Sequence, residues 1–472
     1  MKRSTLGACG ALCFAMPAAA HQVPNATPDI AVSTHDRFYT SDQFSNTVSV
    51  INPATNTLLG VIKLGDLTPT NLSPLYKGQL LVHGMGFSPD RKTLAVISIG
   101  SNSVMFIDTA TNAVKHTTYV GRSPHEAFFR PDGREVWVSI RGENYIQILD
   151  GKTFEPTGRI SVPNGPGMTI FSPTGNYGYV CSSFSPETVV IDTASKKIVG
   201  RVKQESPFCP DIAATPDGKQ VWLTLKDVGK TMVFDAKPPF AVLKAIDTGA
   251  LTNHVNIVRN RLGQFAYVTI GTENIVKVFR TTDFAQVAAI PVGALPHGLW
   301  PSGDGTRIYV GLENADAVAA IDTLRNTVIA TIPIGQGPQG VAYVPGAVPA
   351  GEGVTNLVPL AEAGKKVQLA LAGTGRSQVT LFDQGQVQIL QAAVAGLTPK
   401  MSYVLGLSNR PDGSGPIQPL AKFMTNPAGS AIVNAVGPLR QVVGEANDEM
   451  RRYLVIAPGD PSQVGPAVQV QH

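Results

Sequence analysis

Four histidines recur at a spacing that would place them on one ring of a repeating fold. Each lies six residues ahead of a turn signal, and successive ring positions are 42 to 44 residues apart. The seven positions are His83, His125, Gly167, Pro210, His254, His297 and Gln339. Neutral imidazole is a good ligand for zinc, copper and nickel. The pattern therefore predicts a hub site in which His83, His125, His254 and His297 hold a divalent transition metal, copper or zinc.

A plainer interpretation of the same histidines stays open. In the step Pro296-His297-Gly298 the histidine could simply begin a strand, and its ring would then be bonded to the backbone or solvated at a rim. Other polar groups lie close to the ring positions in sequence: Glu126 and Asp211 directly follow two of them, and Arg141 and Lys226 fall near the ends of the next strands.

Together with Gln339, the residues Glu126, Asp211 and Arg141 could bind a small anionic or sugar-like ligand. Ordinary solvated surface charges explain the charged ones equally well.

The element that must position these residues is a repeated unit of four short strands. In the copy from Leu295 to Gly335, a run at His297 is followed by IYVGL, AVAAID and TVIATI, with turn residues between the runs. Four short strands at a fixed period are typical of a propeller blade. The last copy has a first strand only, near Gln339, and the chain begins with three strands that lack a first one. These pieces are expected to share one blade and close a ring of seven.

The repeat also resembles a known family. The segments SNTVSVINPATNTLLGVI, SVMFIDTATNAV, AYVTIG and GPQGVAYVPG are similar to the YVTN-type, surface-layer and YncE-like propeller repeats of bacterial envelope proteins. The resemblance covers about Arg37 to Gly346 and implies a seven-bladed β-propeller. It implies no particular activity, because propellers carry unrelated functions.

The rest of the chain divides by composition. The run PGAVPAGEGV is a Pro/Gly hinge, and after it the 42-residue period is lost. Short alternating runs there predict a small antiparallel β-sandwich of about seven strands, with a poorly ordered tail from Pro458 to His472. The expected all-β organisation is a signal peptide (1–20), a lead-in (21–36), the propeller (37–346), a linker (347–354) and the sandwich (355–472).

The N-terminus indicates export. MKRSTLGACGALCFAMPAAA has a basic start, an apolar stretch and a small-residue cleavage site, which predicts a periplasmic or secreted protein. Its removal takes Lys2 and Arg3 from the formal charge of +4 and leaves +2 (4 minus 2). This charge is too small to argue for nucleic acid, and no later run is long enough to span a membrane.

Two cysteines remain after the signal segment, Cys181 and Cys209. A disulfide between neighbouring blades is expected in an oxidising compartment. The alternative is two buried thiols, one of which could be a soft metal ligand.

Catalytic signatures are missing from the sequence. There is no CxxCH, GxSxG or HExxH motif and no phosphate-binding loop. Their absence does not exclude an enzyme, because a propeller can assemble a site from single residues on separate blades. The leading expectation is a non-catalytic binding or scaffold protein of the envelope. It could meet a protein partner through the long rim loop LGDLTPTNLSPLYKGQLL. The alternatives are a lactonase or lyase that uses the histidines as acid and base, with Glu126 or Arg141 positioning the substrate, and a surface-layer or adhesion module.

Overall fold

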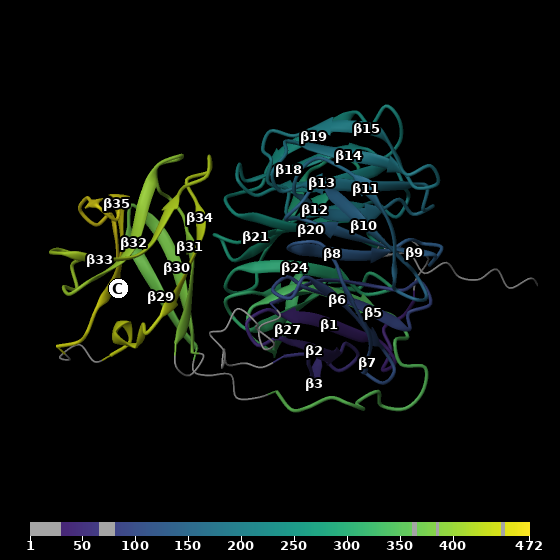
Figure 1. The fold of residues 1–472 in the computed structure, drawn as a ribbon, viewed down its shortest axis with the longest axis horizontal. Helices are drawn as coiled ribbons and strands as arrows, with labels where there is room; N and C mark the ends of the chain where they lie inside the picture. The colour runs from purple at the N-terminus through teal and green to yellow at the C-terminus, as the bar shows by residue number, and fades with distance from the viewer. Residues whose placement is uncertain (1–29, 66–80, 361–365, 384–386, 445–448) are drawn as a thin grey trace, which may run out of the picture.

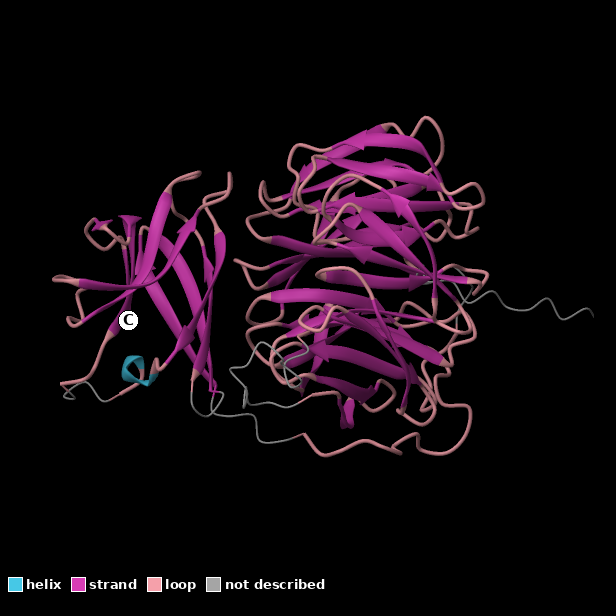
Figure 2. Ribbon diagram, viewed as in Figure 1, coloured by secondary structure: helices cyan, strands magenta, loops and turns pink. Residues whose placement is uncertain are grey.

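The computed structural model describes residues 30–65, 81–360, 366–383, 387–444 and 449–472. The predicted signal segment and most of the long rim loop lie outside these residues. Nearly all regular structure is β-strand, as Figure 2 shows, and the described residues include one short 3-10 helix, Arg440–Val442. No helix in this part of the chain is long and apolar enough to cross a membrane.

The larger body in Figure 1 is a ring of seven antiparallel sheets with four strands each. Its innermost strands are β28 (Pro338–Val344), β4 (Val82–Phe87), β8 (Pro124–Phe129), β12 (Pro166–Phe171), β16 (Ile212–Ala214), β20 (Thr252–Asn260) and β24 (Pro296–Pro301). The second strands are β1 (Arg37–Asp42), β5 (Thr93–Ser98), β9 (Glu135–Ile140), β13 (Tyr177–Ser182), β17 (Gln220–Leu225), β21 (Gly263–Ile270) and β25 (Arg307–Leu312).

The third strands are β2 (Thr47–Asn52), β6 (Ser103–Asp108), β10 (Tyr145–Asp150), β14 (Glu187–Asp192), β18 (Lys230–Asp235), β22 (Ile275–Arg280) and β26 (Ala317–Asp322). The outermost strands are β3 (Thr57–Lys63), β7 (Val114–Tyr119), β11 (Pro156–Ser161), β15 (Lys197–Lys203), β19 (Val242–Asp247), β23 (Gln286–Pro291) and β27 (Thr327–Pro333). Strand β28 pairs with β1, so the predicted seven-bladed propeller, closed by a shared blade, is confirmed.

Burial falls from the centre of each blade to its rim. Every residue of the inner strands β4, β8 and β24 is buried, whereas β11 is exposed at five of its six positions. The turns between first and second strands follow their sequence signal. In one of them Ser302 Oγ donates to Asp304 Oδ1 at 2.7 Å, and Gly305 has a φ of 65°, which glycine adopts without strain.

The C-terminal domain is one antiparallel sheet of nine strands that curls until its end strands contact each other. The order is β33 (Ile417–Met424), β32 (Ser402–Ser408), β35 (Tyr453–Asp460), β37 (Gln469–Gln471), β29 (Lys366–Gly373), β30 (Gly375–Asp383), β31 (Gln388–Val394) and β34 (Ala431–Gly437), with β36 (Gln463–Val464) paired to β35. The expectation of a poorly ordered tail is wrong. Strand β37 completes the sheet between β35 and β29, and Gln469 within it is fully buried.

A strap connects the two bodies and runs along the propeller (Figure 1). Val61 and Val358 exchange backbone hydrogen bonds of 2.9 and 3.0 Å, and the Asn112 amide donates to the carbonyls of Gly353 and Thr355. The described part of the C-terminal sheet then starts at Lys366.

The C-terminal sheet docks on the face of the propeller where the inner strands begin. Lys366 Nζ lies 3.4 Å from Asp316 Oδ2, and the Gln368 side-chain amide donates to the Asn314 carbonyl oxygen at 2.7 Å. Apolar contacts join the same surfaces: Leu251, Leu295 and Ala393 form one buried cluster. The sheet therefore covers the mouth of the propeller's central channel.

Candidate functional site

All four predicted histidines meet at the hub. His83, His125 and His297 are the second residues of β4, β8 and β24, and His254 is the third residue of β20. The rings pack in pairs, with centroids 4.4 Å apart for His83 and His125 and 4.3 Å apart for His254 and His297. Each residue is 5 to 7% exposed. The four histidines are therefore buried, and the expectation that they could be solvated at a rim is wrong.

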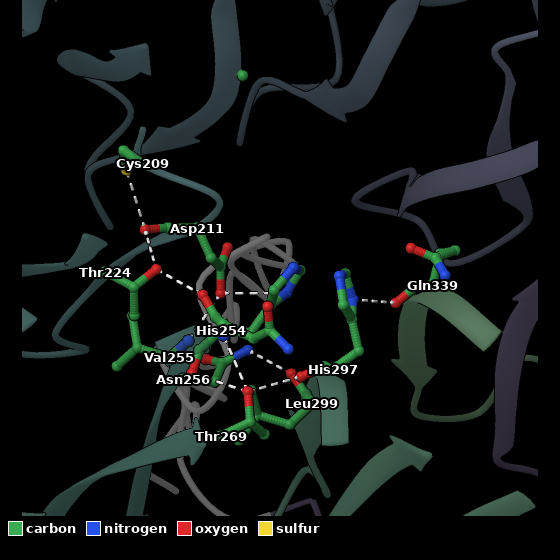
Figure 3. A network of polar contacts seen from close by, with 12 residues as sticks. Cys209, Asp211, Thr224, His254, Val255, Asn256, Thr269, His297, Leu299 and Gln339 are labelled. Atoms are coloured by element: carbon green, nitrogen blue, oxygen red, sulfur yellow. Dashed lines mark hydrogen bonds and ion pairs between the residues drawn. The ribbon is translucent and has the colours of Figure 1, made fainter. Parts of the chain in front are cut away.

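Three of the rings have a polar neighbour at Nδ1, two of which appear in Figure 3. His125 Nδ1 lies 2.9 Å from the Gly167 carbonyl oxygen, and His297 Nδ1 lies 3.3 Å from that of Gln339. A carbonyl can only accept, so these two nitrogens carry the proton. His254 Nδ1 lies 3.4 Å from Asp211 Oδ2. His83 Nδ1 and His254 Nε2 are buried without a hydrogen-bond partner in the described structure.

Burial keeps the four imidazoles neutral. It lowers the pKa of His83 to about 3, with a further contribution from the charges of Arg141 and Lys226. Burial also lowers the pKa of His254 to about 3 and holds the pKa values of His125 and His297 well below the ordinary value. At neutral pH the hub therefore has four uncharged rings, each with donor and acceptor capacity.

The histidines form the floor of a pocket of about 470 Å³ between the propeller and the C-terminal sheet. A second ring of residues lines it above them: Gln43, Arg141, Lys226 and Glu313 each come directly after a second strand of a blade, β1, β9, β17 and β25. The sequence analysis did not find Gln43 and Glu313. Counting one residue past each second strand would have found them.

Two cations in this pocket make no direct ion pair in the described structure. No ion pair or side-chain hydrogen bond involves the Arg141 guanidinium or the Lys226 ammonium in the described structure, and Arg141 Nε is buried. Both lie against the Phe208 ring, with the Arg141 Cζ at 5.4 Å and the Lys226 Nζ at 5.9 Å from its centre. Burial lowers both pKa values, and Glu313 opposes this shift at Lys226.

The carboxylates of the pocket already have partners. Glu313 Oε1 accepts from Gln391 Nε2 at 2.9 Å, and Asp227 accepts a side-chain hydrogen bond from Asn426. Burial raises the pKa of both carboxyl groups, which weakens them further as counter-charges. Glu313 and Asp227 thus act on Lys226 only at longer range, and neither of them contributes to the pKa shift of Arg141.

Glu126 and Asp211 lie elsewhere. They line a smaller cavity of about 30 Å³ deeper in the channel, beside Met85 and Trp300, and His254 lines both spaces. Burial raises the pKa of Asp211 to about 8 and that of Glu126 well above its ordinary value, with the neighbouring Asp211 adding to the second shift. Of the ligand set predicted from sequence, the structure places Arg141 and Gln339 in the main pocket and separates Glu126 and Asp211 from them.

The hub geometry gives no support to a metal centre. In the described residues no group of three or more His, Cys, Asp or Glu side chains is arranged to hold a metal ion. The rings of His83, His125, His254 and His297 pack against one another, and three Nδ1 atoms already face protein oxygens. The copper or zinc site stays a prediction from sequence. The predicted disulfide between Cys181 and Cys209 is confirmed.

These observations define a seven-bladed β-propeller whose hub pocket is covered by a second β domain. A family model described as a YNCE-like beta-propeller matches residues 4–348, and the chain belongs to that family. The C-terminal sheet lies beyond the matched residues.

Similar proteins share the propeller. The uncharacterized protein YncE of Salmonella typhi is 23% identical over 282 residues, which cover 54% of this chain and 75% of that protein; YncE of Salmonella typhimurium gives the same values. Kuenenia stuttgartiensis hydrazine synthase has a similar fold, with a TM-score of 0.53 at 18% identity over 67% of this chain and 99% of that one. A functionally unknown protein from Desulfotomaculum acetoxidans has a TM-score of 0.52 at 16% identity, over 65% and 98% of the two chains.

Proposed function

We propose that this protein binds a small anionic ligand in the pocket between the propeller hub and the C-terminal sheet. The observation that carries the proposal is a pair of cations, the buried Lys226 and the partly buried Arg141, neither of which makes an ion pair within 4 Å among the described residues. A buried charge is costly unless it is paired, and a bound anion would pair both. Of the four neutral imidazoles beneath them, those of His83 and His254 can still supply a hydrogen-bond donor, because the N–H groups of the other two already donate to backbone carbonyls.

We also propose a periplasmic or secreted location in a bacterial envelope. The signal-like N-terminus supports export, and the disulfide between Cys181 and Cys209 is typical of an oxidising compartment. A soluble ligand-binding protein or scaffold of the envelope fits both features. A protein partner at the rim loop stays a prediction from sequence.

One contact favours a second candidate, an acid–base enzyme of the lactonase or lyase type. His254 Nδ1 faces Asp211 Oδ2 at 3.4 Å, and a carboxyl group that orients an imidazole is a common arrangement for a general base. The role predicted for Glu126 as a substrate-positioning group is not supported, because Glu126 lies outside the main pocket. Arg141 keeps that role in the enzyme alternative.

The proposal is tested by calorimetric titration of the purified protein with sulfate, phosphate, hexanoate and D-gluconate. At least one of these anions should bind. The double variant Arg141→Met, Lys226→Met should weaken that binding by tenfold or more, since hydrogen bonds to charged groups are worth about 1.5–3 kcal/mol. The matched control is Lys219→Met, Arg325→Met, whose side chains are 75 and 77% exposed.

Two results would contradict the proposal. The first is a wild-type protein that binds none of the four anions, and the second is a double variant that binds as tightly as its control. Elemental analysis of the same sample tests the alternative metal site: stoichiometric copper, zinc or nickel that is lost on His83→Ala, His297→Ala would assign the hub to a metal.

A further inference from the structure

The C-terminal sheet is a fixed wall of the pocket, because its loop between β33 and β34 is tied to the propeller. Asn426 Oδ1 accepts from the backbone nitrogens of Ala428 and Ser430, each at 3.0 Å. The Asn426 side chain also donates to the Asp227 carboxylate, and the Ala428 nitrogen donates to the Asp227 carbonyl at 3.1 Å. This loop and β34 therefore reach the pocket as a part of its structure.

The wall contributes uncharged polar groups rather than charges. Gln391 on β31, Asn426 and Ser430 in the loop and Asn434 on β34 line the pocket, opposite Gln43 and Gln339 of the propeller. Amide and hydroxyl side chains both donate and accept hydrogen bonds. They suit a ligand whose own groups do the same.

The hydrogen bonds of the Gln391 side-chain amide indicate that the ligand carries a hydrogen-bond donor. The side chain is 4% exposed, and its Nε2 is used by Glu313. Its Oε1 is buried without a hydrogen-bond partner in the described structure. The Gln391 amide therefore has acceptor capacity that the described residues leave unused, and a fully ionised anion such as sulfate has no hydrogen to donate to an amide oxygen.

We infer that the ligand is a small hydroxylated carboxylate, of the size of a sugar acid, whose hydroxyl groups are recognised by the C-terminal domain. This inference rests on the proposed function: the carboxylate pairs with Arg141 and Lys226, and the hydroxyls bond to the polar side chains of the wall, with the Gln391 amide turning its oxygen toward the ligand. A pocket of about 470 Å³ is within the usual range for small-molecule sites. The C-terminal domain thereby determines which anion the propeller retains.

Four probe molecules separate the need for a carboxylate from the need for hydroxyl groups. D-gluconate has a carboxylate and hydroxyls, hexanoate has the carboxylate alone, D-glucose has hydroxyls alone, and sulfate has charge without a hydroxyl. We expect D-gluconate to bind at least tenfold more tightly than each of the other three in calorimetric titrations of the full chain. Equal affinity for hexanoate or sulfate would overturn the inference while leaving anion binding intact. No binding of any anion would remove the proposed function and the inference together.

The variant Gln391→Met tests the wall itself. Methionine has a similar length and no hydrogen-bonding amide, so affinity for D-gluconate should fall about tenfold while that for hexanoate stays within twofold. The control is Gln418→Met, an exposed glutamine on the edge strand β33. A melting temperature close to that of the wild type shows that the variant is folded, and Asn434→Leu at the pocket edge provides a second variant if it is not. Equal losses for both ligands, or no loss from either variant, would overturn the assignment.

Discussion

At the scale of single residues, the hub is dominated by titratable groups held in their neutral forms. Burial raises the pKa of Asp211 from 3.8 to about 8, so the folded protein keeps this proton up to about pH 8 while the unfolded chain has lost it. The folded state therefore binds more protons, and this stabilising contribution is lost as the pH rises. The four hub histidines act in the opposite direction at the lower end of the range from pH 6.5 to 8, because the unfolded histidines, with a pKa near 6.5, still bind protons there while the folded ones do not. The contribution of Asp211 is therefore obtained as a difference between a variant and the wild type.

The variant Asp211→Asn should remove this dependence. Its amide copies the shape of the neutral carboxyl group and does not titrate, so the slope of unfolding free energy against pH between 6.5 and 8 should be higher in the variant than in the wild type by up to about 1.4 kcal/mol per pH unit. Urea unfolding at several pH values measures the slope. Asp217→Asn, at an exposed turn position of the same blade, is the control. A slope that is the same in both variants and the wild type would show that Asp211 ionises normally.

At the scale of elements, adjacent inner strands approach so closely that glycine is needed between them. A Cβ on Gly298 of β24 would lie 2.5 Å from the Gln339 carbonyl oxygen of β28, which is also the partner of His297 Nδ1. Gly84 and Gly340, the residues after His83 and Gln339, meet comparable obstacles. At these three ring positions the following glycine is therefore a packing requirement, whereas other ring positions have larger residues there, such as Glu126 and Asp211.

Gly298→Ala should destabilise the protein by about 1–3 kcal/mol, the usual cost of inserting a methyl group into a well-packed interior. The obstacle is backbone, which cannot rotate away as a side chain does. Gly158→Ala on β11 is the matched control, because nothing lies within 4 Å of its added Cβ. Chemical denaturation of the two variants gives the comparison. If Gly298→Ala were as stable as Gly158→Ala, the inner strands would be more loosely packed than the structure shows.

Much of the architecture could be predicted because each blade repeats the same short-range signals. The period placed His83, His125, His254 and His297 on one ring, and the incomplete first and last copies predicted closure. The partners of these residues could not be predicted. Gln391 reaches Glu313 across 78 positions and a domain boundary, and no local pattern marks such a pair. Nor does any local pattern show that Arg141 lines the main pocket while Glu126 lines the smaller cavity.

At the scale of the whole molecule, ring closure and the disulfide hold the hub together. The Cys181–Cys209 bond joins β13 to the segment before β16. Strand β16 has three residues and is the shortest of the seven inner strands. Removing it with Cys181→Ala, Cys209→Ala should lower the unfolding free energy by about 3 kcal/mol, since the bond closes a chain separation of 28 residues. A reductant present during denaturation should lower the stability of the wild type by a similar amount and leave the double variant unchanged. Two titratable thiols in denatured protein that was purified without reductant would instead show that the cysteines are not joined in the cell.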